Sequence, residues 1–131
     1  MSVVVRTVDK VVGAPSAEGP QLSFQVGRIT AREIVRARVR MEVERYNSED
    51  EGGFVSLFVP ARQECELNGP ARVRRRTLDA DRQVEVALEA VRGGRVVILF
   101  NGAQVTDLDA ELVVTPVSEG RFLRLVPLVG G

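Results

Sequence analysis

Several side chains that commonly carry chemistry are absent or rare in this sequence of 131 residues. It contains no histidine, which removes the commonest general base and metal ligand in proteins. Its one cysteine, Cys65, excludes an internal disulfide and a thiolate metal cluster, and the neighbours Glu64 and Glu66 disfavour a reactive thiolate. The paired acids Asp107 and Asp109 fall in a predicted turn, which explains them without catalysis. We therefore expect no catalytic residues, no metal site, no bound cofactor and no enzymatic activity.

An excess of one charge is also absent. The 18 basic and 18 acidic residues cancel, so no long-range field recruits nucleic acid or an anionic membrane. No apolar run approaches the ~20 residues of a membrane helix, and no basic-then-apolar signal begins the sequence. The expectation is a cytoplasmic protein that binds neither nucleic acid nor membrane. Lys10 is the only lysine, which fits either codon bias or a protein that is conjugated to lysines and benefits from having few.

The residues that are present predict one globular domain that begins with a β-hairpin. The hydrophobic fraction of 44% and the charged fraction of 27% are typical of a soluble globular chain, and the length favours one core. The valine-rich stretch Val3–Val12 predicts a strand. A turn rich in proline and glycine follows at 13–20, and then Leu22, Phe24 and Val26 alternate with polar residues, which predicts the second strand.

A long helix is predicted after the hairpin. Thr30 and Glu33 have the spacing of a capping box, in which each side chain accepts from the other residue's backbone amide. The apolar residues that follow recur at spacings of three and four, which predicts an amphipathic helix of about four turns lying on the sheet. The apolar face would contain Ala31, Ile34, Val35, Val39, Met41, Val43 and Tyr46. The other face would contain Arg32, Arg36, Arg40, Glu42 and Glu44.

The middle of the chain is less regular. Asn47–Gly53 is acidic and rich in glycine, which predicts a mobile loop. Phe54–Val59 predicts a short strand. A basic run at Arg72, Arg74, Arg75 and Arg76 predicts a solvated loop or, less often, a patch that binds a partner. Asp79–Arg92 has apolar residues at helical spacing, which predicts a second helix, and the two glycines after it are a typical C-cap.

The last third of the chain predicts further strands. Arg95–Phe100 is almost entirely apolar after its first residue and therefore predicts a central strand. The pair Asn101-Gly102 is the strongest short signal for a hairpin turn. Ser118–Gly120 predicts another turn, and Arg121–Val126 predicts the final strand. A hairpin, a long helix and then more strands form an α+β pattern.

The segment after that last strand is Pro127-Leu128-Val129-Gly130-Gly131, which is apolar until its two glycines. A carboxylate becomes reactive once ATP adenylates it, and glycine allows a close backbone approach to an active site because it has no Cβ. Burial of Leu128 and Val129 in a partner returns ~1.5–3 kcal/mol each, and Pro127 fixes one φ in advance. The candidate working group is the carboxylate of Gly131, with the four residues before it as the partner-binding segment.

Arg95–Gly131 resembles the C-terminal half of ubiquitin-like β-grasp proteins, including the bacterial sulfur carriers of thiamin and molybdopterin synthesis. The features that carry the resemblance are Asn101-Gly102, Val105, the Leu108-Asp109 turn, Ser118–Gly120 and the Pro127–Gly131 tail. The resemblance implies a single β-grasp domain over 1–131, with the first and last strands parallel neighbours in a mixed sheet and the long helix across it. It also implies that 47–94 is an insertion with the second helix, and that 127–131 is a flexible tail.

The insertion decides between two branches of this resemblance. Sulfur carriers are shorter and have no counterpart of 47–94, which favours the ubiquitin-like modifiers of bacterial conjugation operons, encoded beside E1-like, E2-like and JAB-type protease genes. The resemblance then implies that an E1-like enzyme uses ATP to adenylate Gly131, which passes to cysteines as a thioester and forms an isopeptide bond with a target protein. Two alternatives stay open. One is a sulfur carrier whose Gly131 becomes a thiocarboxylate, and the other is a β-grasp domain that only binds a partner.

Overall fold

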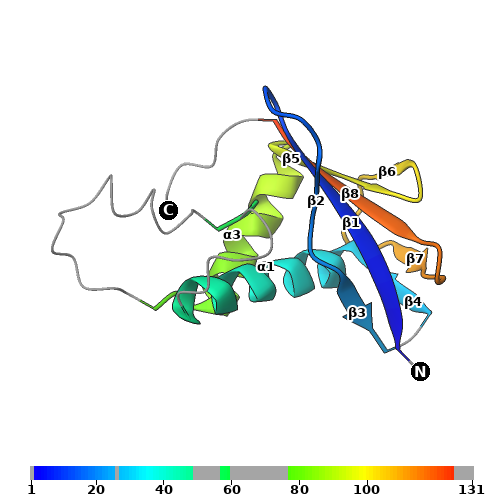
Figure 1. The fold of residues 1–131 in the computed structure, drawn as a ribbon, viewed down its shortest axis with the longest axis horizontal. Helices are drawn as coiled ribbons and strands as arrows, with labels where there is room; N and C mark the ends of the chain where they lie inside the picture. The colour runs from blue at the N-terminus through cyan, green and yellow to red at the C-terminus, as the bar shows by residue number, and fades with distance from the viewer. Residues whose placement is uncertain (1, 26, 49–56, 60–76, 126–131) are drawn as a thin grey trace, which may run out of the picture.

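A computed structural model describes residues 2–25, 27–48, 57–59 and 77–125 of the chain. In this part the fold is α+β, with two helices and a mixed sheet that share one core (Figure 1). The helices are α1 (Ala31–Ser48) and α3 (Ala80–Arg92). The strands of the main sheet are β1 (Val3–Val11), β2 (Ala17–Glu18), β3 (Leu22–Phe24), β5 (Val96–Phe100), β6 (Ala103–Val105) and β8 (Glu119–Arg124). The strands β4 (Arg28–Thr30) and β7 (Glu111–Val113) pair separately with each other.

The last strand, β8, lies inside the main sheet. The strand order is β2-β1-β8-β5-β6, and β3 also pairs with β1. β1 and β8 run parallel, from the pair Arg6↔Glu119 to the pair Val11↔Arg124. β5 and β8 run antiparallel. The prediction that the first and last strands are parallel neighbours is therefore confirmed, as is the prediction that Arg95–Phe100 forms an internal strand.

The two predicted hairpins are present with small shifts. The partner of β1 is split into β2 and β3, and β2 falls in the segment predicted as a turn. Asn101 and Gly102 both have positive φ, at 51° and 86°, as the turn between β5 and β6 requires. The turn predicted at 118–120 was wrong for Glu119 and Gly120, because both residues pair with β1 within β8.

The capping box at the start of α1 is confirmed. The amide of Thr30 donates to Glu33 Oε2 at 2.7 Å, and the amide of Glu33 donates to Thr30 Oγ1 at 3.2 Å. The helix has 18 residues and is about one turn longer than predicted. It continues through Asn47 and Ser48, which were predicted as loop. Asn47 stabilises this end because its side chain forms two hydrogen bonds with the backbone of Leu78, just before α3.

One residue of α1 was assigned to the wrong face. Glu42 was predicted on the polar side, but it is fully buried, as is Arg38 one turn before it. A helix turns 100° per residue, so a residue eleven positions after Ala31 returns to nearly the same face. The spacing therefore predicts burial of Glu42, and only its charge suggested exposure.

The region between the helices is described at 57–59 and again from residue 77. The predicted strand was wrong at 57–59, which forms a bend whose amides donate to Glu42. The second helix is confirmed. Asp79 caps it by accepting from the amide of Asp81, and Gly93 forms its C-cap. The rest of the predicted loop and strand, Val26 and the basic run at 72–76 lie outside the described residues.

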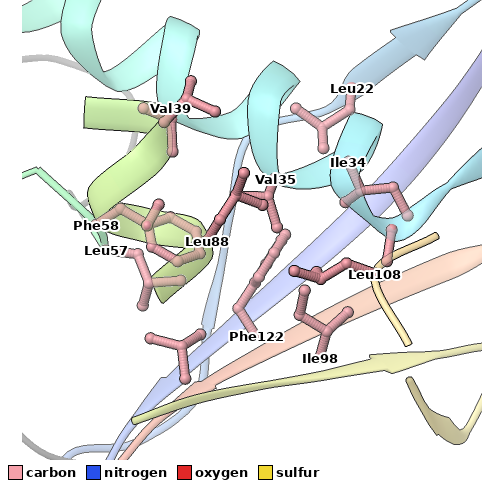
Figure 2. Packing of buried hydrophobic residues seen from close by; sticks show 14 of the residues in the cluster. Leu22, Ile34, Val35, Val39, Leu57, Phe58, Leu88, Ile98, Leu108 and Phe122 are labelled. Atoms are coloured by element: carbon pink, nitrogen blue, oxygen red, sulfur yellow. The ribbon is translucent and has the colours of Figure 1, made fainter. Parts of the chain in front are cut away.

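The core joins both helices, the segment 57–59 and most of the strands around Phe122 of β8. This side chain is fully buried, and its ring lies 5.8 Å from that of Phe58 in an edge-to-face arrangement. Figure 2 shows the side chains of Leu57, Phe58 and Leu88 gathered next to Phe122. The segment 57–59 is thus part of the same core as the sheet and both helices.

Candidate functional site

The sequence-predicted site residues Pro127, Leu128, Val129, Gly130 and Gly131 lie outside the described residues. The structure does describe the point from which they follow, which we call the tail root and define as Arg124 and Leu125. Leu125 donates its amide to the carbonyl of Arg95 at 2.8 Å. The carbonyl of Arg124 accepts from the amide of Val12 at 3.0 Å. The tail root is thus bonded on both sides, toward β5 and toward β1.

The outer surface at the tail root carries two exposed apolar side chains between charged neighbours. Val12 is 58% exposed and Leu125 is 39% exposed, and both belong to the few large apolar side chains with high exposure in the described part of the chain. The next cross-strand row contains Lys10, Leu123 and Val97, which follows from the registers of β1 and β5 with β8. The exposed apolar area at this place thus consists of Val12 and Leu125, and Lys10 and the exposed Arg95 lie beside them.

The inner side of the tail root carries a guanidinium. Arg124 donates from Nη1 to the carbonyl oxygen of Leu57 at 3.2 Å. Its Nε atom is buried and has no hydrogen-bond partner within the described segments. A sequence pattern could not reveal this contact, because the two residues are 67 positions apart.

A buried ionic network lies deeper in the same region. Arg38 donates from both terminal nitrogens to the two Asp9 oxygens, at 2.8 and 2.7 Å, and from Nε to Glu42 Oε2 at 2.6 Å. Its guanidinium also lies 5.3 Å from the centre of the Phe122 ring. Burial alone would lower the pKa of Arg38, but the hydrogen bond to Asp9 and the charge of Glu42 outweigh it, so its pKa is raised. The network holds structure together and offers no reactive group to solvent.

Sequence reasoning missed this network, although a signal for it exists. Asp9 falls on the inward-facing positions of β1 together with Val5 and Thr7. Arg38 and Glu42 have the i,i+4 spacing of a helical ion pair and share the buried face of α1. Opposite charges that recur at core positions of a strand and a helix therefore predict an internal ion pair.

A shallow groove lies at the other end of β1, where β3 and α1 are neighbours. Its volume is about 480 Å³. Its lining contains apolar, neutral polar and charged side chains, namely Ser23, Phe24, Gln25, Ile29, Glu33, Arg36, Ala37 and Arg40. β3 pairs with the first residues of β1, Val3 to Val5, whereas the tail root follows Val11. The groove is therefore separate from the tail root.

Within the described segments, no group of three or more histidine, cysteine, aspartate or glutamate side chains is arranged to hold a metal ion. None of the helices described is both long enough and apolar enough to span a membrane. Cys65 lies outside the described residues.

Comparison of the chain with protein-family models, with curated proteins and with solved structures gives no match. The fold and the tail root are therefore the features of this chain that bear on its function.

Proposed function

We propose that this protein is a ubiquitin-like modifier with a β-grasp fold, in which α1 is the helix that crosses the sheet. An E1-like enzyme would activate it at the carboxylate of Gly131. The observation that carries the proposal is the parallel pairing of β1 with β8 inside the sheet, the arrangement that a β-grasp requires. In such a fold the strand that leads into residues 126–131 is also one of the most firmly held.

The proposed reaction uses the chain as an acyl donor. A carboxylate oxygen of Gly131 attacks the α-phosphorus of ATP, the bond to the bridging oxygen breaks and pyrophosphate leaves. A thiolate of the activating enzyme then attacks the acyl carbon, and AMP leaves. After transfer to an E2-like protein, a target amine attacks the thioester, loses a proton and releases the thiolate. A JAB-type protease would hydrolyse the isopeptide bond. The chain itself supplies the carboxylate and the tail root, which is anchored by backbone hydrogen bonds.

The geometry of the tail root suits this role. Two backbone hydrogen bonds fix Arg124 and Leu125, the residues that directly precede 126–131 in the sequence. Six extended residues after Leu125 span up to ~20 Å, which is long enough to enter an enclosed active site. The exposed side chains of Val12 and Leu125 provide apolar area for docking at the same place.

The proposal is tested by deletion of Gly130 and Gly131. These residues have no side chains, so the free energy of unfolding should change by less than ~0.5 kcal/mol. Adenylation should be lost because the reacting carboxylate is displaced by up to ~7 Å of extended chain. Gly131→Val should be nearly as harmful, since a branched side chain crowds the path of the carboxylate. The measurement is ATP–pyrophosphate exchange with a purified cognate E1-like enzyme, and Val117→Ala, at an exposed position, is the control.

The products decide between the alternatives. Conjugates that survive reducing agent support the modifier, whereas a sulfur-for-oxygen mass change at Gly131 without conjugates would identify a sulfur carrier. Full function of the truncated chain in cells would overturn both and leave a domain that acts through its folded surface. The intact mass of the protein from its own cells must also show Gly131 as the last residue of the active form.

A further inference from the structure

Arg124 makes a third contact at the tail root, in addition to the two backbone hydrogen bonds. It is the last residue of β8, and its Nη1 donates to the carbonyl of Leu57 at 3.2 Å. Leu57 belongs to the segment 47–94, which the sequence predicts as an insertion. Arg124 therefore connects the strand before the tail with that segment.

The acceptor of this hydrogen bond is itself firmly held. The carboxylate of Glu42 accepts from three consecutive amides, those of Leu57 at 2.9 Å, Phe58 at 2.9 Å and Val59 at 2.8 Å. All three of these side chains are buried in the core, and so is Glu42. The Leu57 carbonyl is consequently a fixed point of the fold, to which a neighbouring strand can be attached.

Stability alone does not explain an arginine at position 124. Its cross-strand neighbours are Val11 and Val96, so an apolar side chain would fit the same row of the sheet. The Arg124 Nε atom is buried without a partner in the described part of the chain, and such a group costs stability. Evolution commonly tolerates that cost where a residue serves the function.

We propose that Arg124 is a positioning residue, whose hydrogen bond to Leu57 couples the segment 57–59 to the tail root and so holds in place the point from which the activating enzyme would receive Gly131. The coupling rests on the described geometry alone. Its consequence for activation rests on the proposed function. The segment 57–59 thereby acts as a brace for the tail root, in addition to filling the core.

Amide hydrogen exchange tests the coupling without any enzyme. Arg124→Met removes the donor and should lower the protection of the Leu125 amide about tenfold, while amides of the β5–β6 hairpin stay unchanged. Arg124→Lys retains a donor of similar reach and should restore most of the protection. Arg121→Met is the matched control, because Arg121 lies exposed on the opposite face of β8. Equal protection of Leu125 in the wild type and in Arg124→Met would overturn the inference.

A double-mutant cycle tests whether the effect passes through the segment 57–59. Glu42→Gln weakens the anchor of that segment and changes no residue of β8, so it should also lower the protection of Leu125. The double variant Glu42→Gln, Arg124→Met should then be little worse than Arg124→Met alone. Independent effects, whose factors multiply in the double variant, would contradict the proposed coupling.

The activating enzyme supplies the functional readout. Arg124→Met should raise the KM for this protein about tenfold and leave kcat nearly unchanged, because a less firmly held tail root must be ordered on binding while the reacting carboxylate is intact. Arg124→Lys should lie close to the wild type. No adenylation of the wild-type chain would overturn the proposed function and leave the exchange result to decide the coupling. Normal adenylation with an unchanged KM in Arg124→Met would overturn the positioning role.

Discussion

Asp9, Arg38 and Glu42 place two carboxylates and one guanidinium in the interior of a small domain. Replacement of such groups by apolar residues is often neutral for stability, so their value here is better sought in what they hold in place. Glu42 accepts hydrogen bonds from Arg38 and also from the three backbone amides of 57–59. The charge of Glu42 thus determines the path of a segment far away in the sequence.

A second ion pair, on the surface, gives a pH-dependent prediction. Arg32 donates to both oxygens of Asp109, at 2.9 and 3.3 Å, and this hydrogen bond lowers the pKa of Asp109. Because the folded pKa lies below the unfolded value, the pair contributes stability above the unfolded pKa and loses it as the pH falls through the folded pKa. Exposure of both side chains keeps the contribution small.

NMR titration of the Asp109 carboxyl carbon should therefore give a pKa below the ordinary range. Arg32→Met should raise that pKa toward its usual value, and high salt should have a weaker effect in the same direction. Arg36→Met, one turn further along α1, is the control and should leave the Asp109 titration unchanged. An Asp109 pKa that does not respond to Arg32→Met would contradict the assigned cause.

At the scale of elements, the hairpin and α1 are joined at Gly19, between β2 and β3. A Cβ at this position would lie 2.6 Å from Thr7 Oγ1, 2.9 Å from Asp9 Oδ1 and 3.0 Å from Arg38 Nη1. The backbone amide of Gly19 also donates to the Thr7 carbonyl at 3.0 Å. The absence of a side chain therefore lets the second half of the hairpin pass directly over the buried network.

Gly19→Ala should lower the free energy of unfolding by ~1–3 kcal/mol, because the added methyl group overpacks fixed, hydrogen-bonded atoms. Gly27→Ala is a suitable control, since its Cβ would have an ordinary contact of 3.6 Å with the Val114 carbonyl. Urea unfolding of both variants measures the difference. A Gly19→Ala protein as stable as the wild type would show that the approach between hairpin and helix is looser than described.

Local signals predicted most elements, and long-range contacts account for the errors. The Thr30 capping box and the Asn101-Gly102 turn depend on neighbouring residues, so the sequence alone was sufficient for them. The strand predicted at 57–59 failed because its amides bond to Glu42, more than a dozen residues earlier, and no short window contains both. The candidate residues 127–131 stay a prediction, and the Arg124 contact beside them has no local pattern.

At the scale of the whole molecule, Phe122 connects the parts of the core. It extends from β8 toward Phe58 and Arg38, and the same cluster contains buried residues of α1 and α3. Its neighbour Leu123 lies on the opposite face of the strand and is only half-buried. Truncation of Phe122 removes contacts in the shared core, whereas truncation of Leu123 removes side-chain volume only on the other face of the same strand. Comparison of the two truncations therefore isolates the contribution of the shared core.

Phe122→Ala should lower the free energy of unfolding by ~3–5 kcal/mol, and Leu123→Ala should cost about 1 kcal/mol. Far-UV circular dichroism reports the helices, and the fluorescence of Tyr46 reports the end of α1. Both probes should give the same single transition in each variant, since one core joins both helices and most of the strands. Separate transitions would show that the helices and the sheet unfold independently, and equal costs at the two positions would contradict the central place of Phe122 in the core.

The internal position of β8 also has a consequence for the order of events during synthesis. β1 emerges from the ribosome before the other described strands, but its parallel partner spans Glu119 to Arg124 and is made more than 100 residues later. Pairing across so long a stretch is slow, and the edge of β1 stays open until it occurs. A nascent chain therefore cannot complete its sheet before the tail root is made. The sheet and the tail root therefore become complete in the same step of folding.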